Sequence, residues 1–277
     1  MGVLVVIPAR YGSVRFPGKP LAQLRGKPVI QHVYEGAAQA TGVDEVVVAT
    51  DDQRIIEAVE RFHGKAVMTS PTARSGTERV AEVARSRDAH VVINVQGDEP
   101  LIQPDMVGQL AEFLSRHQAV PMASLMTKLT RPDDVANPNV VKVVVDRDGF
   151  ALYFSRAPIP YVRKADVGSR LQAPQFAEGS RLKAEGKSLE PRASSLERSS
   201  AQPPAWKHLG IYGYQRHFLL QFPHLEPTLL EQLEQLEQLR ALEHGYRIKL
   251  LETVHDTIGV DTPEDLQQVE RLMVGVR

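Results

Sequence analysis

Three short runs of apolar, mostly β-branched residues recur in the first part of this 277-residue chain, at Val3 to Ile7, Val46 to Ala49 and Val91 to Val95. Continuous runs of this kind are typical of parallel strands, which are buried on both faces of a sheet. Apolar and small residues at helical spacing lie between and after them, at residues 28–40, 53–62, 77–86 and 104–117. The alternation predicts an α/β fold with a mostly parallel central sheet and helices on both faces.

The rest of the chain predicts further strands, some with only short connections. Three more runs have strand-like composition, at residues 121–130, 140–145 and 150–155. The last two predict a hairpin across Asp146 to Gly149, and hence a smaller mixed sheet region beside the parallel one. Beyond them we expect a strand at 208–214, a helix at 229–244, a strand at 246–253 and a helix from Thr262.

Residues 164–205 separate these two groups of elements. The segment is rich in Ser, Pro, Gly and mixed charge and has no sustained apolar period. Such a composition buries too little apolar surface to fold by itself. We therefore predict a single domain over residues 1–277 with a flexible insertion at 164–205. We expect the insertion to be slack rather than a lid, because a longer loop adds only ~0.6 kcal/mol per doubling of its length.

Composition excludes several classes of protein. The 33 Lys and Arg residues against 34 Asp and Glu leave a net charge of −1, so we expect no nucleic-acid partner and no anionic membrane surface as partner. The chain has no cysteine, which excludes disulfides, thiolate metal ligands and a thiol nucleophile. The run from Val3 to Ile7 is too short for a signal peptide or for the ~20 apolar residues of a membrane span. We therefore expect a cytoplasmic protein.

The segment IPARYGSVRFPGKP, which follows the first predicted strand, is the strongest candidate for a ligand-binding loop. It carries Arg10, Arg15 and Lys19, and no acidic residue precedes Glu35. Open α/β sheets bind ligands at the carboxyl ends of their strands, and uncompensated cations there suit a polyphosphate. The loop has neither the GxGxxG dinucleotide fingerprint nor the GxxxxGK[ST] pattern of a P-loop. A solvated basic loop is the alternative interpretation.

Two aspartates are candidate metal ligands. Asp98 follows the strand Val91 to Val95 and would present a hard oxygen ligand in the same crevice, as Mg²⁺ bridging phosphates requires. Asp261 directly precedes a helix start in which Thr262 and Asp265 form a near capping box, so the Asp261 side chain is not needed to cap the helix. A turn or helix-entry role remains the alternative for each aspartate.

Two further motifs have a structural interpretation beside the functional one. Ser75 and Glu78 have capping-box spacing, and the free amides of the helix that they open can bind an anion. Capping does not account for Gly76, which would allow a ligand to approach the backbone. The Leu-Glu-Gln triplets between Leu230 and Gln238 turn about 300° per repeat on a helix, so they do not keep a coiled-coil seam. This disfavours an assembly protein built on that helix.

Together these segments resemble one family, the 3-deoxy-manno-octulosonate (Kdo) cytidylyltransferases, also called CMP-Kdo synthetases. The resemblance runs from Val3 to Val269 and is interrupted at 164–205. It is carried by IPARYGSVRFPGKPL, VATDD, SGTERVAEV, NVQGDEPLI, NPNVVKVV, ALYFSRAPIP, HLGIYGY, LEQLR and GVDTPEDL. The early motifs are shared with sialic acid synthetases, whereas ALYFSRAPIP and HLGIYGY indicate Kdo. The resemblance implies a Rossmann-like nucleotidyltransferase fold.

The resemblance also implies a reaction, in which the anomeric hydroxyl of Kdo attacks the α-phosphate of CTP and gives CMP-Kdo and pyrophosphate for lipopolysaccharide biosynthesis. It implies Mg²⁺ held by Asp98 and Asp261, and a homodimer. Motif positions assign the nucleotide to Arg10, Ser13, Arg15, Lys19, Ser75, Gly76 and Arg79. They assign the sugar to Gln96, Arg156, His208, Tyr212, Glu237 and Gln238. We expect Lys19, Arg15, Asp98 and Asp261 to act in catalysis.

Two alternatives to this function stay open from the sequence. The first keeps the chemistry and changes the acid sugar to a sialic acid or an amino variant of Kdo, since Arg156 would serve any carboxylate. The second is a protein that binds a nucleotide sugar without turning it over. It predicts nucleotide binding without pyrophosphate release, and it leaves the pair Asp98 and Asp261 unexplained.

Overall fold

The computed structural model of the chain describes residues 2–12, 15–161 and 205–275. Ser13 and, apart from Ala205, the predicted insertion at 164–205 lie outside these residues.

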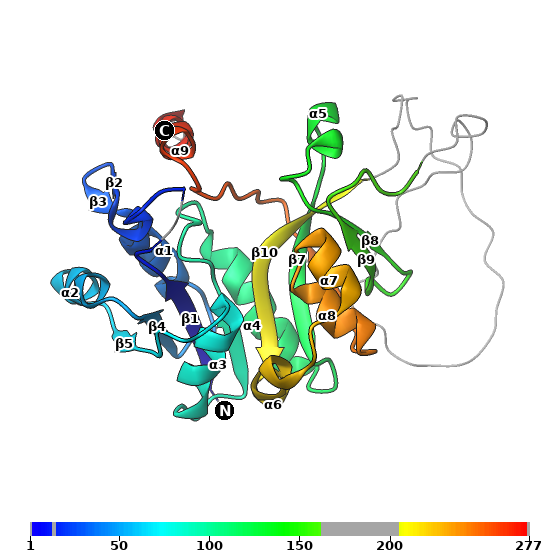
Figure 1. Ribbon diagram of the computed structural model, residues 1–277, viewed down its shortest axis with the longest axis horizontal. Coiled ribbons are helices and arrows are strands. Elements are labelled where there is room, and N and C mark those ends of the chain that lie inside the picture. Colours follow the sequence, from blue (N-terminus) through cyan, green and yellow to red (C-terminus); the bar gives the residue numbers. More distant parts are fainter. Residues whose placement is uncertain (1, 13–14, 162–204, 276–277) are drawn as a thin grey trace.

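A mixed sheet forms the centre of the fold (Figure 1). Its main strand order is β11-β7-β10-β6-β1-β4-β5. These strands are β1 (Val3–Ala9), β4 (Glu45–Thr50), β5 (Ala66–Met68), β6 (Val91–Asn94), β7 (Met122–Lys128), β10 (Trp206–Gln215) and β11 (Ile248–Glu252). Among the strands of this main order, β10 alone is antiparallel to both of its neighbours, and the other pairs are parallel. The predicted mostly parallel sheet is confirmed.

The predicted hairpin is confirmed at the end of the sheet away from β5. It consists of β8 (Lys142–Val145) and β9 (Ala151–Ser155), which pair in antiparallel fashion. Strand β8 joins the main sheet through the first residues of β10. A second small hairpin, β2 (Gln23–Leu24) with β3 (Lys27–Pro28), follows the 3-10 helix η1 (Lys19–Leu21).

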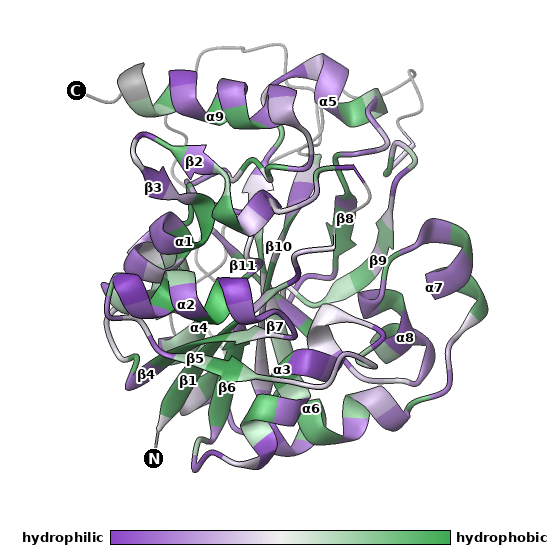
Figure 2. Ribbon diagram, turned by 60° about the vertical axis from the view of Figure 1, so that its left-hand side comes forward, coloured by the Kyte–Doolittle hydropathy of each residue, from purple (hydrophilic) through white to green (hydrophobic). Residues whose placement is uncertain are grey.

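Helices cover both faces of the sheet because successive residues of each buried strand point to opposite sides. In β1, Val5 and Ile7 belong to one core cluster with α1, α2 and α4, while Leu4 and Val6 belong to another with α3, α6 and α8. Figure 2 shows β1 and β6 as hydrophobic almost throughout, as burial on both faces requires.

The helices agree with most of the predicted ranges. They are α1 (Val29–Ala38), α2 (Gln53–Arg61), α3 (Gly76–Arg85), α4 (Pro104–Arg116), α5 (Pro132–Ala136), α6 (Arg216–Gln221), η2 (Phe222–His224), α7 (Leu229–Glu234), α8 (Gln238–Glu243) and α9 (Pro263–Gly275). Within the described ranges, no helix is both long and apolar enough to cross a membrane.

The single helix predicted at 229–244 is wrong. The chain forms α7 and α8 instead, and α7 ends where Gln235 adopts a left-handed conformation with φ 53°. The amide of Leu236 then bonds back to Glu231 O at 3.2 Å, as in a helix C-cap. The chain therefore turns sharply between the two helices.

The three-residue leucine period explains this break. On a continuous helix, leucines three apart drift around the surface and cannot all reach one core. The turn leaves Leu233 71% exposed and brings Leu236 and Leu239 into the core, at 6% and 0%. Burial of two leucine side chains stabilises the turn by roughly 1.5–3 kcal/mol each, more than the roughly 1–2 kcal/mol that a left-handed residue costs.

Glycine substitution tests the break. We expect Gln235→Gly to raise the free energy of unfolding by about 0.5–1 kcal/mol, because glycine adopts the left-handed conformation without a Cβ penalty. Gln232→Gly, inside α7, is the control and should lower it by about 1 kcal/mol. Urea denaturation measures both. A continuous helix would make both substitutions destabilising.

Candidate active site

The candidate site lies where the loops after β1 and β6 meet. These strands are adjacent and parallel, and the chain order reverses between them, which is the ligand-binding position in open α/β sheets. The two loops touch closely, because a Cβ added at Gly97 would lie 2.8 Å from Pro8 O. A residue without a side chain is therefore required at position 97.

Two cavities open at this place. The smaller, about 320 Å³, is lined by most of the residues assigned to the nucleotide together with Gln96 and Asp98, namely Arg10, Lys19, Ser75, Gly76, Arg79, Gln96 and Asp98. The larger, about 1020 Å³, is lined by Arg15, Arg156, His208, Tyr212, Gln238 and Asp261. The structure thus separates the assigned residues into two groups that largely follow the two substrates.

Three assigned residues depart from this division. Gln96, assigned to the sugar, lines the smaller cavity. It still lies close to the larger one, since a Cβ added at Gly210 would be 3.9 Å from its Cγ. Arg15, assigned to the nucleotide, lines the larger cavity. Glu237 is not among the residues that line either cavity.

Lys19 connects the two cavities. Its Nζ donates to Asp98 Oδ2 at 2.5 Å and to Asp261 Oδ1 at 3.1 Å, and its side chain is 11% exposed. Burial lowers the pKa of Lys19, but the two carboxylates outweigh burial, so the pKa is raised and the ammonium stays charged. Arg15 Nη2 also contacts Asp261, at 3.0 Å. Two acids from distant parts of the chain therefore converge on one cation.

The start of α9 places Asp261. The predicted capping box is confirmed: Thr262 Oγ1 accepts from the amide of Asp265, and the Asp265 carboxylate accepts from the amides of Asp261 and Thr262. The amide of Val260 donates to Asp98 O at 2.8 Å, which joins this segment to the loop after β6. The Asp261 side chain takes no part in the cap and remains available to the site.

The N-terminus of α3 forms one wall of the smaller cavity. Ser75 is its N-cap, and its Oγ accepts from the amide of Glu78 at 3.2 Å, so the predicted cap is confirmed. Arg79, one turn further along, is fully buried and contacts Asp51 at 2.7 Å and Thr69. Its Nε has no partner among the described residues. Arg79 is therefore held in the wall by its own ion pair.

Arg156 is held by backbone carbonyls in the larger cavity. Its guanidinium donates to Glu234 O at 2.7 Å, to Pro138 O at 2.9 Å and to Gln235 O at 3.4 Å. A guanidinium has five N–H groups, so one remains on each terminal nitrogen after these bonds. Free N–H groups of a guanidinium can donate to a carboxylate.

His208 lies in β10 at the wall of the larger cavity. The ring is 6% exposed, and its Nε2 is 2.9 Å from Ser124 Oγ. Burial lowers its pKa from 6.5 to about 3. Tyr212, further along the same strand, packs its ring 5.4 Å from that of His208. Burial, with Glu237 and Glu99 nearby, raises the pKa of Tyr212 above its usual value. Both side chains are neutral near pH 7.

Gln238 and Glu237 follow the break between α7 and α8. Gln238 is 4% exposed, and its Nε2 has no partner in the described part of the chain. An unpaired buried N–H beside a cavity suits a ligand oxygen. Glu237 instead accepts a hydrogen bond from Thr77 Oγ1 at 2.5 Å.

Two further charged residues line the cavities although the motifs did not assign them to the site, Glu99 and Arg74. Glu99 lines the larger cavity, and its Oε2 has no partner among the described residues. Burial, then Asp98, raises the pKa of Glu99 to about 7, although a bond from Thr257 acts in the opposite direction. Arg74 lines the smaller cavity and pairs with Glu78. Glu99 lies within NVQGDEPLI and Arg74 directly precedes SGTERVAEV, so their closeness to these motifs could have indicated them.

The low pKa of His208 predicts a pH dependence of stability. The unfolded chain takes up a proton on this ring below pH 6.5, whereas the folded protein does so only at about pH 3. The free energy of unfolding therefore falls with decreasing pH through this window, and the contribution at pH 5 is about 2 kcal/mol. His208→Gln should remove that share of the loss between pH 8 and pH 5 in urea denaturation.

The matched control for this substitution is His217→Gln, at an exposed position of α6. We expect this variant to keep the loss of stability that His208 causes between pH 8 and pH 5. An unchanged slope in His208→Gln would contradict a buried neutral ring.

Comparison with known proteins identifies the family to which the chain belongs. The chain matches the family model described as cytidylyltransferase over residues 4–249. The 3-deoxy-manno-octulosonate cytidylyltransferase of Geobacter sulfurreducens is 47% identical over 269 residues, 97% of this chain and 98% of the relative. The relative of the same name from Geotalea uraniireducens is 48% identical over 273 residues, 98% of this chain and 99% of the relative.

A solved structure agrees. CMP:2-keto-3-deoxy-manno-octonic acid synthetase complexed with CTP superposes with a TM-score of 0.83, at 41% identity over 99% of each chain. The resemblance seen in the motifs is confirmed over nearly the whole length. This chain therefore belongs to the cytidylyltransferases, within the family of 3-deoxy-manno-octulosonate cytidylyltransferases.

Proposed function

We propose that this protein transfers CMP from CTP to the anomeric hydroxyl of Kdo and releases pyrophosphate. The observation that carries the proposal is the cluster of Lys19, Asp98 and Asp261 at the meeting point of two cavities. One cavity offers cations and a helix N-terminus to a nucleotide, and the other offers neutral polar groups and Arg156 to an acid sugar. The names of the relatives, and the CTP in the solved one, support both assignments.

The smaller cavity suits the triphosphate. The exposed cations Arg10 and Arg74 line it, together with the buried Lys19. When pyrophosphate leaves, negative charge grows on the β-phosphate, and preorganised cations stabilise it at no further cost in reorganisation. We assign Lys19 and Arg15 to this role. The sequence assigns Ser13 to the same loop, but that residue lies outside the described ones.

The donor set at the cluster fits Mg²⁺. Asp98 and Asp261 both lie within hydrogen-bonding distance of one cation, Lys19 Nζ, so their carboxylates already converge on a single positive charge. Among the residues described, no group of three or more metal-binding side chains occurs. Mg²⁺ commonly takes one or two carboxylates and completes its shell with phosphate oxygens and water. When bound, Mg²⁺ would polarise the phosphate at which the sugar attacks.

The larger cavity suits Kdo. The two remaining N–H groups of Arg156 would take its carboxylate, and His208, Tyr212 and Gln238 would bond its hydroxyls. Because His208 and Tyr212 stay neutral, the only full positive charge among these four groups is at Arg156. Among these four groups, Arg156 is therefore the one that would attract the sugar carboxylate.

Other parts of the proposal follow from the family resemblance. We propose that CMP-Kdo made by this protein serves lipopolysaccharide biosynthesis in the cytoplasm, and that the protein works as a homodimer. Exposed leucines on the described surface, Leu152, Leu229 and Leu233, are compatible with an association between copies. Sedimentation equilibrium measures the mass directly.

Pyrophosphate release tests the function. With CTP and Mg²⁺, we expect release with Kdo and none with sialic acid or without sugar, and mass spectrometry should identify CMP-Kdo. Release with another acid sugar would preserve the phosphate assignments and overturn the assignment of the sugar. CTP binding without release with any sugar would favour a non-catalytic nucleotide-sugar binding protein.

Asp98→Asn tests the metal assignment. The side chain keeps its size and Asp261 still pairs with Lys19, so we expect the fold to be kept at lower stability, while one negative ligand is lost. Outer-shell partners of a metal are worth roughly 10- to 100-fold, and a direct ligand should cost at least as much in kcat. Asp105→Asn, whose side chain is 89% exposed, is the control. Near-normal turnover of Asp98→Asn would mean that the metal role is misassigned.

A further inference from the structure

The turn between α7 and α8 positions part of the larger cavity. Gln235, Leu236 and Gln238 belong to this turn or follow it directly, and all three line that cavity. Gln238 contributes a buried Nε2 with no partner among the described residues. The location of this unpaired donor therefore depends on how the turn is held.

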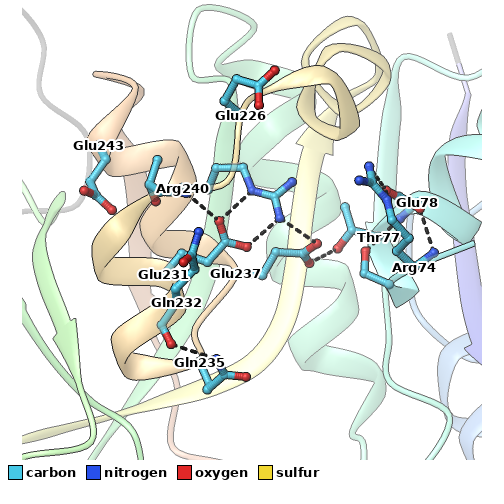
Figure 3. A network of polar contacts seen from close by, with 12 residues as sticks. Arg74, Thr77, Glu78, Glu226, Glu231, Gln232, Gln235, Glu237, Arg240 and Glu243 are labelled. Atoms are coloured by element: carbon cyan, nitrogen blue, oxygen red, sulfur yellow. Dashed lines mark hydrogen bonds and ion pairs between the residues drawn. The ribbon is translucent and has the colours of Figure 1, made fainter.

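The turn is anchored on two sides by glutamates of the Leu-Glu-Gln repeat. On the β9 side, Glu234 accepts from Ser155 Oγ at 2.6 Å and from the amide of Arg156 at 2.9 Å. On the α3 side, Glu237 accepts from Thr77 Oγ1 at 2.5 Å. Figure 3 shows the second anchor, with Thr77 and Glu237 pointing toward each other from α3 and the α7–α8 turn. The turn is therefore clamped between α3 and β9.

The hydrogen bond from Thr77 to Glu237 is shielded from water at its donor end. Thr77 is 4% exposed, so water does not compete for its hydroxyl, and a carboxylate can only accept, so the hydroxyl donates. Thr77 lies in the first turn of α3, next to Gly76, which lines the smaller cavity. The anchor thus joins the wall of one cavity to the wall of the other.

Glu237 has no other contact as close as the one to Thr77 among the described residues. Arg240 Nη2 is 3.9 Å away and is engaged by Glu231, to which its guanidinium donates at 2.5 and 2.8 Å. The Glu237 side chain is 32% exposed. Without the Thr77 hydroxyl, the carboxylate is therefore free to turn to water, and the fold does not require it to stay.

We infer that Thr77 is a positioning residue for the sugar, whose hydroxyl holds Glu237 and, through it, the α7–α8 turn and Gln238 at the larger cavity. The inference rests on the proposed function, which assigns that cavity to Kdo. Thr77 itself is not among the residues that line either cavity, so it acts through Glu237. The same bond ties the location of the sugar-binding turn to the helix that opens the nucleotide cavity.

The test compares Thr77→Val with Thr77→Ser. Valine keeps the shape and loses the hydroxyl, whereas serine keeps the hydroxyl and loses a methyl group. Loss of a hydrogen bond to a charged acceptor predicts that Thr77→Val raises KM for Kdo about tenfold. KM for CTP and kcat should stay within about threefold, since neither Lys19 nor Asp98 is touched. Thr77→Ser should restore KM for Kdo to within about twofold of the unmodified protein.

Several results would overturn the inference. An unchanged KM for Kdo in Thr77→Val would do so, and so would equal impairment in Thr77→Ser, which would indicate packing instead of the hydroxyl. A rise in KM for CTP alone would assign Thr77 to the nucleotide. If the unmodified protein releases no pyrophosphate with Kdo, the proposed function fails instead. The anchor is then tested by unfolding Thr77→Val, Glu237→Ala and the double variant, where strictly additive effects would exclude the bond.

Discussion

The buried ammonium group of Lys19 joins three distant segments of the chain at the site. It joins the loop after β1 to Asp98, 79 residues further along the chain, and to Asp261, 242 residues further along. Burying a charge is costly unless oppositely charged groups surround it, so Lys19 is stable here only when all three segments meet. The same requirement gathers cations of the basic loop and the two candidate metal carboxylates at one point. The contacts that bring these segments together are therefore the same contacts that arrange the site.

Strand β10 contributes the other half of the site. It runs antiparallel between β6 and β7, which places His208 and Tyr212 next to the switch point of a sheet whose other central pairs are parallel. The register with β7 shifts between Leu209 and Tyr212, and bulges of this kind are common beside active sites. Gly210 lies at this bend. A larger residue there would crowd Glu99, because an added Cβ would be 3.1 Å from Glu99 Oε1. The irregular part of the strand therefore lies at the wall of the larger cavity.

Local patterns predicted much of this structure. The β-branched runs became β1, β4 and β6, and the helices predicted between and after them became α1 to α4 within one or two residues at each end. The capping box of Thr262 and Asp265 formed as expected and left the carboxylate of Asp261 available. These features depend on neighbours within one helical turn or one strand, so the local sequence contains the information that specifies them.

Long-range contacts account for what prediction missed. The helix predicted at 229–244 breaks because Leu236 and Leu239 reach a core built by distant elements. Glutamine has no preference for the left-handed conformation that Gln235 adopts, so the local sequence does not indicate the break. The three glutamates of the repeat look alike in sequence, yet Glu231 pairs with Arg240, Glu234 with β9 and Glu237 with Thr77.

The sequence by itself determined the mostly parallel α/β sheet, the basic loop, the two candidate metal aspartates and the family, because each depends on short patterns or on motifs in order. Only the tertiary structure decided that Lys19 lies between Asp98 and Asp261 and that Glu237 is bonded to Thr77. It also decided that the assigned residues divide between two cavities. Pairings across 79 to 242 residues depend on how helices and strands pack, and packing is a property of the whole core, which no single segment encodes.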